Sequence, residues 1–581
     1  MPPPGRRPLP PQQPPPPVPP RPSPSSPPPP PPPRRRPEPA PEPKPRSAPQ
    51  QPSLAKASGS MAIATLVSRI TGFLWKILLA AALGLAAENG AFTVANTLPN
   101  IIYELLLGGV LSSVVVPLLV RAQDDPDGGD GYTDRLLTVG MVMLGITTVI
   151  AVAAAPFFTW LFIDNTGKSN PDLATAFAYL LLPEIFFYGL FALLQAVLNA
   201  KHVFGPGAWA PVLNNVVVCV TIVLYMVMPG KLSIDPVEMG NAKLLTLGLG
   251  TTLGIAIQAL VLIPPLLRSG YRFRWHWGLD DRLREFGGLA AWMLLYVAVS
   301  QVGLVIGTRV MTAGDPGGPA IYANAWLLLQ LPYGVIGVSL LTAILPRMSK
   351  AAADNDIPRL VDDLSLSSRL STVLLGPMSA ALSVAGVSIG LALFSLGHAK
   401  PEEAATLGLS LGASAFGLLP YALVMLQMRV FYAMKDSRTP TLIMILMTAV
   451  KVPLLFMCQA SLADRDVVVG VMMVNSLTYV VGAVAGQMWL WVRLGNLQTK
   501  RVLRTLLVTV VASGIACAVE FGLMKLIGPV FAGFGTLAGA WAKLIVQGIV
   551  VLVIAFGALA LFRVEELRPA TRRITRLVRR G

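Results

Sequence analysis

Charged residues are scarce in this chain. Only 13% of its 581 residues are Asp, Glu, Lys or Arg, whereas 54% are hydrophobic, and the mean hydropathy is +0.62. Soluble domains carry about 25% charged residues. A chain this poor in charge cannot cover a water-facing surface, so a soluble globular enzyme is excluded. The hydrophobicity is spread along most of the chain, which also excludes a receptor with a single span.

Cysteine and histidine are equally scarce. The three cysteines, Cys219, Cys458 and Cys517, each lie inside an apolar run, and the three histidines are scattered. A disulfide framework or a zinc site cannot be built from them. The sequence also lacks a nucleotide-binding loop and a nucleophile–base constellation, so we expect no cofactor, no metal and no enzymatic activity.

Proline and positive charge are in excess, and both are unevenly placed. More than half of the 52 prolines lie in residues 1–53, which are also basic, and the whole chain has a formal net charge of +16. No basic stripe interleaved with aromatic residues lies in a soluble domain, so nucleic acid is not an expected partner. Residues 1–55 are predicted to be a disordered cytoplasmic tail. A docking arm for an SH3-like partner is the other interpretation.

Apolar segments of membrane-spanning length follow one another after Met61. The sequence predicts fourteen of them, at about 61–86, 91–120, 136–162, 173–199, 207–228, 244–267, 286–311, 319–346, 370–397, 404–432, 440–460, 467–492, 502–528 and 536–562. The fold class is therefore an all-α polytopic membrane protein.

The connections between these segments predict the orientation. Most basic residues fall on alternate connections, and the remaining connections carry only Lys168, Lys231, Lys243, Lys400 and Arg465. Cytoplasmic loops are the ones enriched in Lys and Arg. Both termini are therefore expected on the cytoplasmic side of the membrane.

An internal repeat divides the segments into two lobes. Leu98-Pro99 in the second segment is matched by Leu331-Pro332 in the eighth, and the stretch Lys201 to Pro206 is matched by Lys435 to Pro440. Folds of this kind place the substrate at the lobe interface. The expected organisation is a tail (1–55), a first lobe of six helices (56–267), an interfacial amphipathic linker (268–285), a second lobe of six helices (286–492), two further helices (493–562) and a basic cytoplasmic tail (563–581).

Charged side chains inside a bilayer are costly and need a reason. In the first segment Arg69 and Lys76 share one helix face, and Asn96, Asn100 and Glu104 form a polar stripe along the second. An arginine in a water-filled cavity suits a phosphate or pyrophosphate contact. For Lys76 and Glu104, a mutual salt bridge and contact with a ligand both remain open.

The candidate site also includes two basic residues of the second lobe and a candidate hinge in the second segment. Arg429 and Lys451 lie in neighbouring segments of the second lobe, where they are expected to line the cavity. Pro99, Gly108 and Gly109 are candidate hinge residues, although glycine in membrane helices also serves close packing.

Several motifs resemble those of the MurJ/MviN flippases. They are Leu66-Val67-Ser68-Arg69-Ile70-Thr71-Gly72-Phe73, Leu98-Pro99-Asn100, Gln330-Leu331-Pro332-Tyr333-Gly334-Val335 with Leu345-Pro346, and the stretch from Phe431 to Pro440. The resemblance implies the MOP (MATE-like) fold, with two six-helix lobes around a central cavity and two extra helices that line a groove for a lipid tail. Trp75, Tyr103 and Leu327 occupy positions where the family often has arginine.

The function that this resemblance implies is that of a lipid II flippase, which moves the lipid-linked peptidoglycan precursor from the inner to the outer leaflet by alternating access. Lipid II or a similar undecaprenyl-pyrophosphate-linked molecule would be the substrate, with membrane lipids as surroundings. The alternatives are a related polysaccharide-lipid flippase, a MATE-type antiporter, and a non-transporting scaffold that recruits cell-wall synthesis proteins.

Overall fold

The computed structural model of the chain describes residues 54–105, 116–164, 168–278 and 287–567. The proline-rich tail, the candidate hinge residues Gly108 and Gly109, and the basic tail beyond residue 567 lie outside these ranges. All regular secondary structure in the described residues is helical, with no strand among them. The predicted all-α fold class is therefore confirmed.

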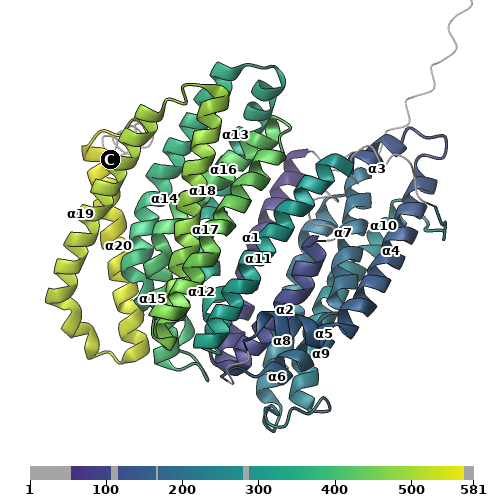
Figure 1. The fold of residues 1–581 in the computed structure, drawn as a ribbon, viewed down its shortest axis with the longest axis horizontal. Coiled ribbons are helices and arrows are strands. Elements are labelled where there is room, and N and C mark those ends of the chain that lie inside the picture. Colours follow the sequence, from purple (N-terminus) through teal and green to yellow (C-terminus); the bar gives the residue numbers. More distant parts are fainter. Residues whose placement is uncertain (1–53, 106–115, 165–167, 279–286, 568–581) are drawn as a thin grey trace, which may run out of the picture. The chain divides into compact units, whose positions relative to one another are not determined.

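The described residues of the first lobe contain ten helices (Figure 1). They are α1 (Leu54–Leu83), α2 (Ala87–Tyr103), α3 (Val116–Ala122), α4 (Asp130–Ala153), α5 (Ala155–Phe162), α6 (Pro171–Leu181), α7 (Glu184–Ala200), α8 (Gly205–Val227), α9 (Ala242–Leu260) and α10 (Ile263–Arg268). Polar caps start several of them. The side chain of Asn170 accepts a hydrogen bond from Leu173 N at the start of α6, and Asn241 does the same for Leu244 N at α9.

The second lobe and the last two helices follow along the chain. The second lobe comprises α11 (Gly287–Gly314), α12 (Gly318–Pro332), the π-helix η4 (Tyr333–Gly337), α13 (Val338–Ala353), α14 (Ile357–Phe394), α15 (Pro401–Ser414), the short 3₁₀ turn η5 (Ala415–Gly417), α16 (Leu418–Ala433), α17 (Arg438–Ser461), the 3₁₀ turn η6 (Asp464–Asp466) and α18 (Val467–Leu494). The chain then forms α19 (Thr499–Ala532), α20 (Thr536–Leu561) and the 3₁₀ turn η7 (Glu565–Leu567).

Thirteen helical stretches among the described residues are long and apolar enough to cross a membrane. They match thirteen of the fourteen predicted spans, and several combine two helices, as α6 and α7 do in Pro171–Ala200. The remaining predicted span, 91–120, contains α2 and α3 at its ends, and its middle lies outside the described residues.

The two lobes repeat each other in detail. Helices α7 and α16 both end in a turn with a left-handed residue, His202 at φ 60° and Lys435 at φ 58°. In each turn the next residue donates a backbone hydrogen bond to the carbonyl five positions earlier, from Val203 to Leu198 (2.8 Å) and from Asp436 to Phe431 (2.9 Å). The geometry therefore aligns His202, and not Lys201, with Lys435.

Two large apolar clusters dominate the packing, and the one centred on the second lobe also includes Ala80 and Leu85 of the first lobe. The first lobe packs around residues such as Phe92, Phe177 and Ile222, whereas the second packs around residues such as Ile321, Leu407 and Val468. Two small clusters join α19 and α20 to α14 through Val373 and Ala380. In Figure 1 the last two helices stand beside α14. The fold therefore has two lobes and two appended helices, as predicted.

Candidate functional site

Arg69 extends from the first lobe to the second. Its side chain is exposed on α1, and a Cβ placed on Gly334 of η4 would lie 1.9 Å from the Arg69 Nη1 atom. Arg69 also lies close enough to Tyr421 of α16 to act on its hydroxyl electrostatically. Among the described residues no acidic side chain pairs with Arg69, so its charge is available to an anionic ligand.

A contact between α1 and α8 accompanies this orientation. Asn215 of α8 donates hydrogen bonds to the Ser68 carbonyl (2.9 Å) and to Thr71 Oγ1 (3.0 Å). The amide of Asn215 also covers Gly72, where an added Cβ would lie 3.4 Å from Nδ2. Gly72 therefore provides close packing between α1 and α8, and this contact fixes the rotation of α1 that turns Arg69 toward the second lobe.

Lys76 and Glu104 do not form a salt bridge with each other. The Nζ atom of Lys76 lies 4.1 Å from the centroid of the Trp75 ring. Glu104 accepts a hydrogen bond from Gln301 of α11, with 3.2 Å between Nε2 and Oε2. Glu104 therefore contacts the second lobe, and Lys76 makes a cation–π contact in place of an ion pair.

The polar side chains of α2 make contacts both within the first lobe and with the second lobe. Asn100 and Asn96 are half-buried, with Asn100 Nδ2 3.5 Å from the Asn96 carbonyl. The Asn100 amide is also within reach of the Tyr188 hydroxyl on α7, inside the same lobe. Of the stripe, Glu104 is therefore the residue that the structure brings to the opposite lobe.

The cations of the second lobe differ in their surroundings. Lys451 of α17 donates a hydrogen bond to Asn475 Oδ1 on α18 (2.9 Å), and its stem packs against Gly303 of α11. Arg429 of α16 is exposed and acts electrostatically on Tyr333. Arg429 therefore joins Arg69 near η4, whereas Lys451 lies between α17, α18 and α11.

Sequence reasoning missed an aromatic cluster between these arginines. The rings of Trp326 and Tyr479 stack with centroids 5.7 Å apart, and Tyr421 packs edge-on against both of them and against Tyr333 at 4.8 Å. Trp326 and Tyr333 lie seven residues apart in one helical segment, which places them on one face. That spacing was the available signal. The partners Tyr421 and Tyr479 come from other segments, and no spacing rule links them.

The candidate hinge is only partly described. Pro99 is buried inside α2, and the backbone changes to π-helical geometry at Glu104 and Leu105. The equivalent place in the second lobe, after Pro332, is the π-helix η4. A π-turn next to a proline weakens the regular helix ladder, so both lobes have the same kind of irregular helix next to the candidate site.

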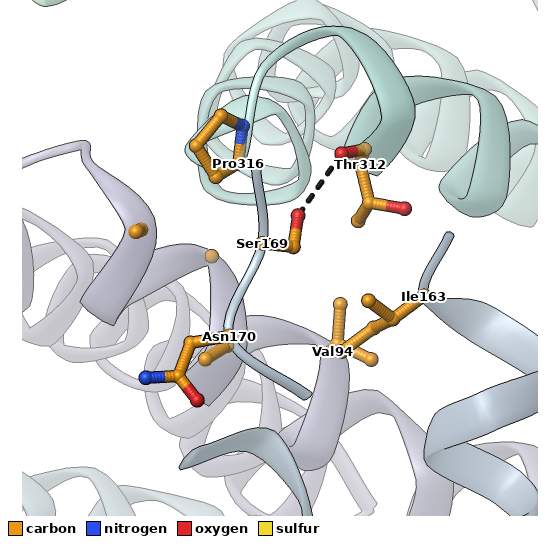
Figure 2. A pocket seen from close by; sticks show the side chains of 9 residues that line it. Val94, Ile163, Ser169, Asn170, Thr312 and Pro316 are labelled. Atoms are coloured by element: carbon orange, nitrogen blue, oxygen red, sulfur yellow. Dashed lines mark hydrogen bonds between the residues drawn. The ribbon is translucent and has the colours of Figure 1, made fainter. Parts of the chain in front are cut away.

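Polar contacts between the lobes gather near the turn that joins α1 and α2. Arg309 of α11 pairs with Asp164 (3.4 Å) and donates to the Trp160 carbonyl (3.2 Å), and Lys168 pairs with Asp464 (2.7 Å). Figure 2 shows Ser169 donating to the Thr312 carbonyl, beside a crevice too narrow for water. This end of the lobe interface is closed.

Two glycines let the lobe backbones meet there. A Cβ on Gly90 would lie 1.9 Å from the Pro316 carbonyl oxygen, and one on Gly317 would lie 2.0 Å from that of Leu85. Nearby, burial raises the pKa of the Asp315 carboxyl above its usual range, although the Gly317 N–H opposes this shift. The closure thus depends on direct backbone contact.

Metal ligands do not cluster in the described residues, where no group of three or more His, Cys, Asp or Glu side chains could hold an ion. What the arrangement offers is two exposed arginines, one on each lobe, flanking an aromatic surface. Such a site suits a ligand that has an anionic group and a ring or other planar surface that can pack against aromatic side chains.

Comparisons with known proteins agree with this architecture. The chain is 26% identical to a probable lipid II flippase MurJ of Rhizobium meliloti over 71% of this chain and 77% of the relative, and 26% identical to one of Thermotoga maritima over 90% and 99%. A solved structure of a lipid II flippase MurJ in an inward closed conformation superposes with a TM-score of 0.66 at 18% identity, covering 87% of this chain and 98% of that one.

The fold extends to a second group of transporters. An inward-facing multidrug resistance MATE family transporter of the MOP superfamily superposes with a TM-score of 0.59 at 16% identity, over 76% of this chain and 99% of that one. The model of the family described as lipid II flippase MurJ matches residues 79–534, most of the membrane-spanning part. The chain is a multi-pass membrane protein that belongs to the lipid II flippase MurJ family.

Proposed function

We propose that the protein transports lipid II from the inner to the outer leaflet of the bacterial cytoplasmic membrane by alternating access of the interface between its lobes. The observation that carries this proposal is the position of Arg69, which reaches Gly334 of the opposite lobe without an acidic partner among the described residues. Membership of the flippase family supports the choice of substrate. It also supports a transport role in place of an enzymatic one.

The candidate residues would contact different parts of the lipid II molecule. Arg69 and Arg429 would contact the pyrophosphate, because guanidinium groups bind phosphate oxygens bidentately. Asn96, Asn100 and Glu104 would contact the sugar-peptide part, and Lys76 and Lys451 would add positive potential to the cavity wall. Pro99, together with Gly108 and Gly109, would absorb the bending of the second span.

The orientation follows from the loop charges. With both termini in the cytoplasm, the closed α1–α2 end faces outward, so the described conformation is the one that would load substrate from the inner leaflet. The tails 1–55 and 563–581 would then be cytoplasmic. The helices of 493–562 would hold the lipid tail while the two lobes (56–267 and 286–492), joined by the linker 268–285, carry the headgroup.

Complementation tests the proposal. Arg69→Ala should fail to support growth of a bacterium depleted of its own flippase, at membrane levels equal to those of the unchanged protein. Arg268→Ala is the matched control, because Arg268 is exposed at the end of α10 and far from η4 in sequence and packing. Full growth of the Arg69→Ala strain would contradict the assignment of this arginine.

A further inference from the structure

A strongly charged pocket lies away from the lobe interface, where α14, α19 and the turn after α20 meet. Its volume is about 500 Å³. Its charged lining consists of Arg369, Arg501, Arg504, Arg563, Glu565 and Glu566. Four arginines against two glutamates leave a surplus of two positive charges, so the pocket favours an anion.

Part of this charge is already neutralised. Glu566 pairs with Arg369, and their side chains are only 3% and 14% exposed. Arg504 and Arg563 are exposed, and neither forms an ion pair within the described residues. The Arg369–Glu566 pair therefore builds the wall of the pocket, and the surplus positive charge comes from Arg501, Arg504 and Arg563 against Glu565.

The backbone at Arg563 is strained in a way that holds this cation at the pocket. Arg563 has φ 54°, a left-handed conformation that glycine adopts at the ends of helices without strain. The turn is closed by the bond from Val564 N to the Leu559 carbonyl (3.2 Å), and Val564 is buried in an apolar cluster with Val373.

The pocket lies at a membrane boundary. Helix α14 has 38 residues and is about 57 Å long, far more than the roughly 30 Å of a bilayer core. Arg369 lies about 18 Å from its start, so the first part of α14 extends beyond the membrane and Arg369 marks the edge. Val508 and Phe562 add apolar surface to the same lining. Charge and apolar surface together are the features of a lipid headgroup region.

We propose that this pocket binds the phosphate of an anionic membrane phospholipid, with Arg504 and Arg563 on the phosphate and Val508 and Phe562 against the first carbons of its chains. Guanidinium groups pair with phosphate oxygens through charge-assisted hydrogen bonds. The site is separate from the lobe interface and does not depend on the identity of the transported substrate.

Native mass spectrometry of the purified full chain tests the site. The protein is taken from nanodiscs of phosphatidylcholine that contain phosphatidylglycerol, with excess inorganic phosphate as one competitor and undecaprenyl pyrophosphate as another. Retention of phosphatidylglycerol should fall roughly tenfold or more in Arg504→Gln/Arg563→Gln, because the charge-assisted hydrogen bonds to the phosphate are lost. The control Arg268→Gln/Arg272→Gln removes the same charge from exposed positions elsewhere and should retain the lipid.

A second variant separates binding from folding. Arg563→Gly relieves the left-handed strain, so it should raise the melting temperature in pure phosphatidylcholine while it lowers phosphatidylglycerol retention. Equal retention in the double variant and the control would overturn the proposal. Displacement of the lipid by inorganic phosphate would show a free-phosphate site, and preferential binding of undecaprenyl pyrophosphate would show a substrate site; either result would also overturn it.

Discussion

The guanidinium of Arg69 lies against the backbone of Gly334, across the interface between the two lobes. An added Cβ on Gly334 would stand 1.9 Å from Nη1. This cation of the first span thus packs against a residue that has no side chain.

Gly334→Ala is expected to displace Arg69 and to lower transport about tenfold, because one charge-assisted contact would be lost or misplaced. The arginine can move aside, so folding should be preserved. Gly514→Ala is the matched control, since a Cβ there meets open space on α19. Flippase activity of the two variants at equal expression checks this, and equal activity would contradict a role for the Arg69–Gly334 contact.

Gly90→Ala should open the closed end of the interface. The atom that a new Cβ would meet is a backbone carbonyl oxygen, that of Pro316, so no rotamer change relieves the clash and the lobes must separate. A cysteine in place of the buried Thr312, with the three native cysteines replaced, should then react faster with a membrane-impermeant maleimide added from outside. Gly145→Ala, where a Cβ meets nothing, should leave the rate unchanged. Equal labelling rates in both variants would show that this closure does not depend on the glycines.

The Asp436 turn predicts a pH-dependent stability. Partial burial opposes ionisation, but hydrogen bonds from the Thr439 N–H and hydroxyl and from Arg493 outweigh it and hold the pKa of Asp436 below its usual range. Because the folded pKa is the lower one, this stabilisation is complete above about pH 4 and is lost as pH falls through the folded value. Asp436→Asn should cost about 1–2 kcal/mol at pH 7.

Thermal unfolding in detergent at several pH values checks this prediction. The difference between Asp436→Asn and the unchanged protein should shrink steadily below about pH 4. A difference that stays constant down to the lowest pH at which the protein is folded would show that the charge of Asp436 is not what stabilises the turn.

The last two helices are joined to the second lobe by a chain of partly buried polar side chains. Ser388 of α14 donates to Gln547 Oε1 (2.7 Å), and Gln547 Nε2 of α20 donates to Glu520 Oε1 of α19 (2.9 Å). Gln547→Leu leaves the buried Glu520 without this donor and should cost about 1–3 kcal/mol of stability. Lys525→Gln, at an exposed position that makes only a cation–π contact with Phe521, should be neutral. If both variants unfold at the same temperature, this chain of polar side chains is not structural.

Sequence patterns predicted the parts of this fold that hydrophobicity and local chemistry determine. Spanning length and loop charge gave thirteen spans that the structure contains, and the turns at His202 and Lys435 follow from short matched motifs. Contacts between distant segments were not predictable in the same way. The approach of Arg69 to Gly334 depends on the rotation of α1 that Asn215 imposes, and the Tyr421–Tyr479 contact joins helices with no common period.

The same limit explains why Lys76 and Glu104 were open to two interpretations. Similar depth in adjacent antiparallel helices made an ion pair geometrically reasonable. The structure turns Glu104 to Gln301 and places Lys76 over Trp75, which occupies a position where the family often has arginine. Depth can be counted from a sequence, but the direction of a side chain around a helix at a π-turn cannot.

The proposed role of Arg69 in moving lipid II between leaflets can be measured in cells whose only flippase is this protein. The amount of lipid II accessible at the outer leaflet is compared with that in cells that carry Arg69→Ala at equal membrane levels. Outer-leaflet lipid II should fall about tenfold or more with Arg69→Ala and should be unchanged with Arg268→Ala. Unchanged outer-leaflet lipid II with Arg69→Ala would contradict the proposed role.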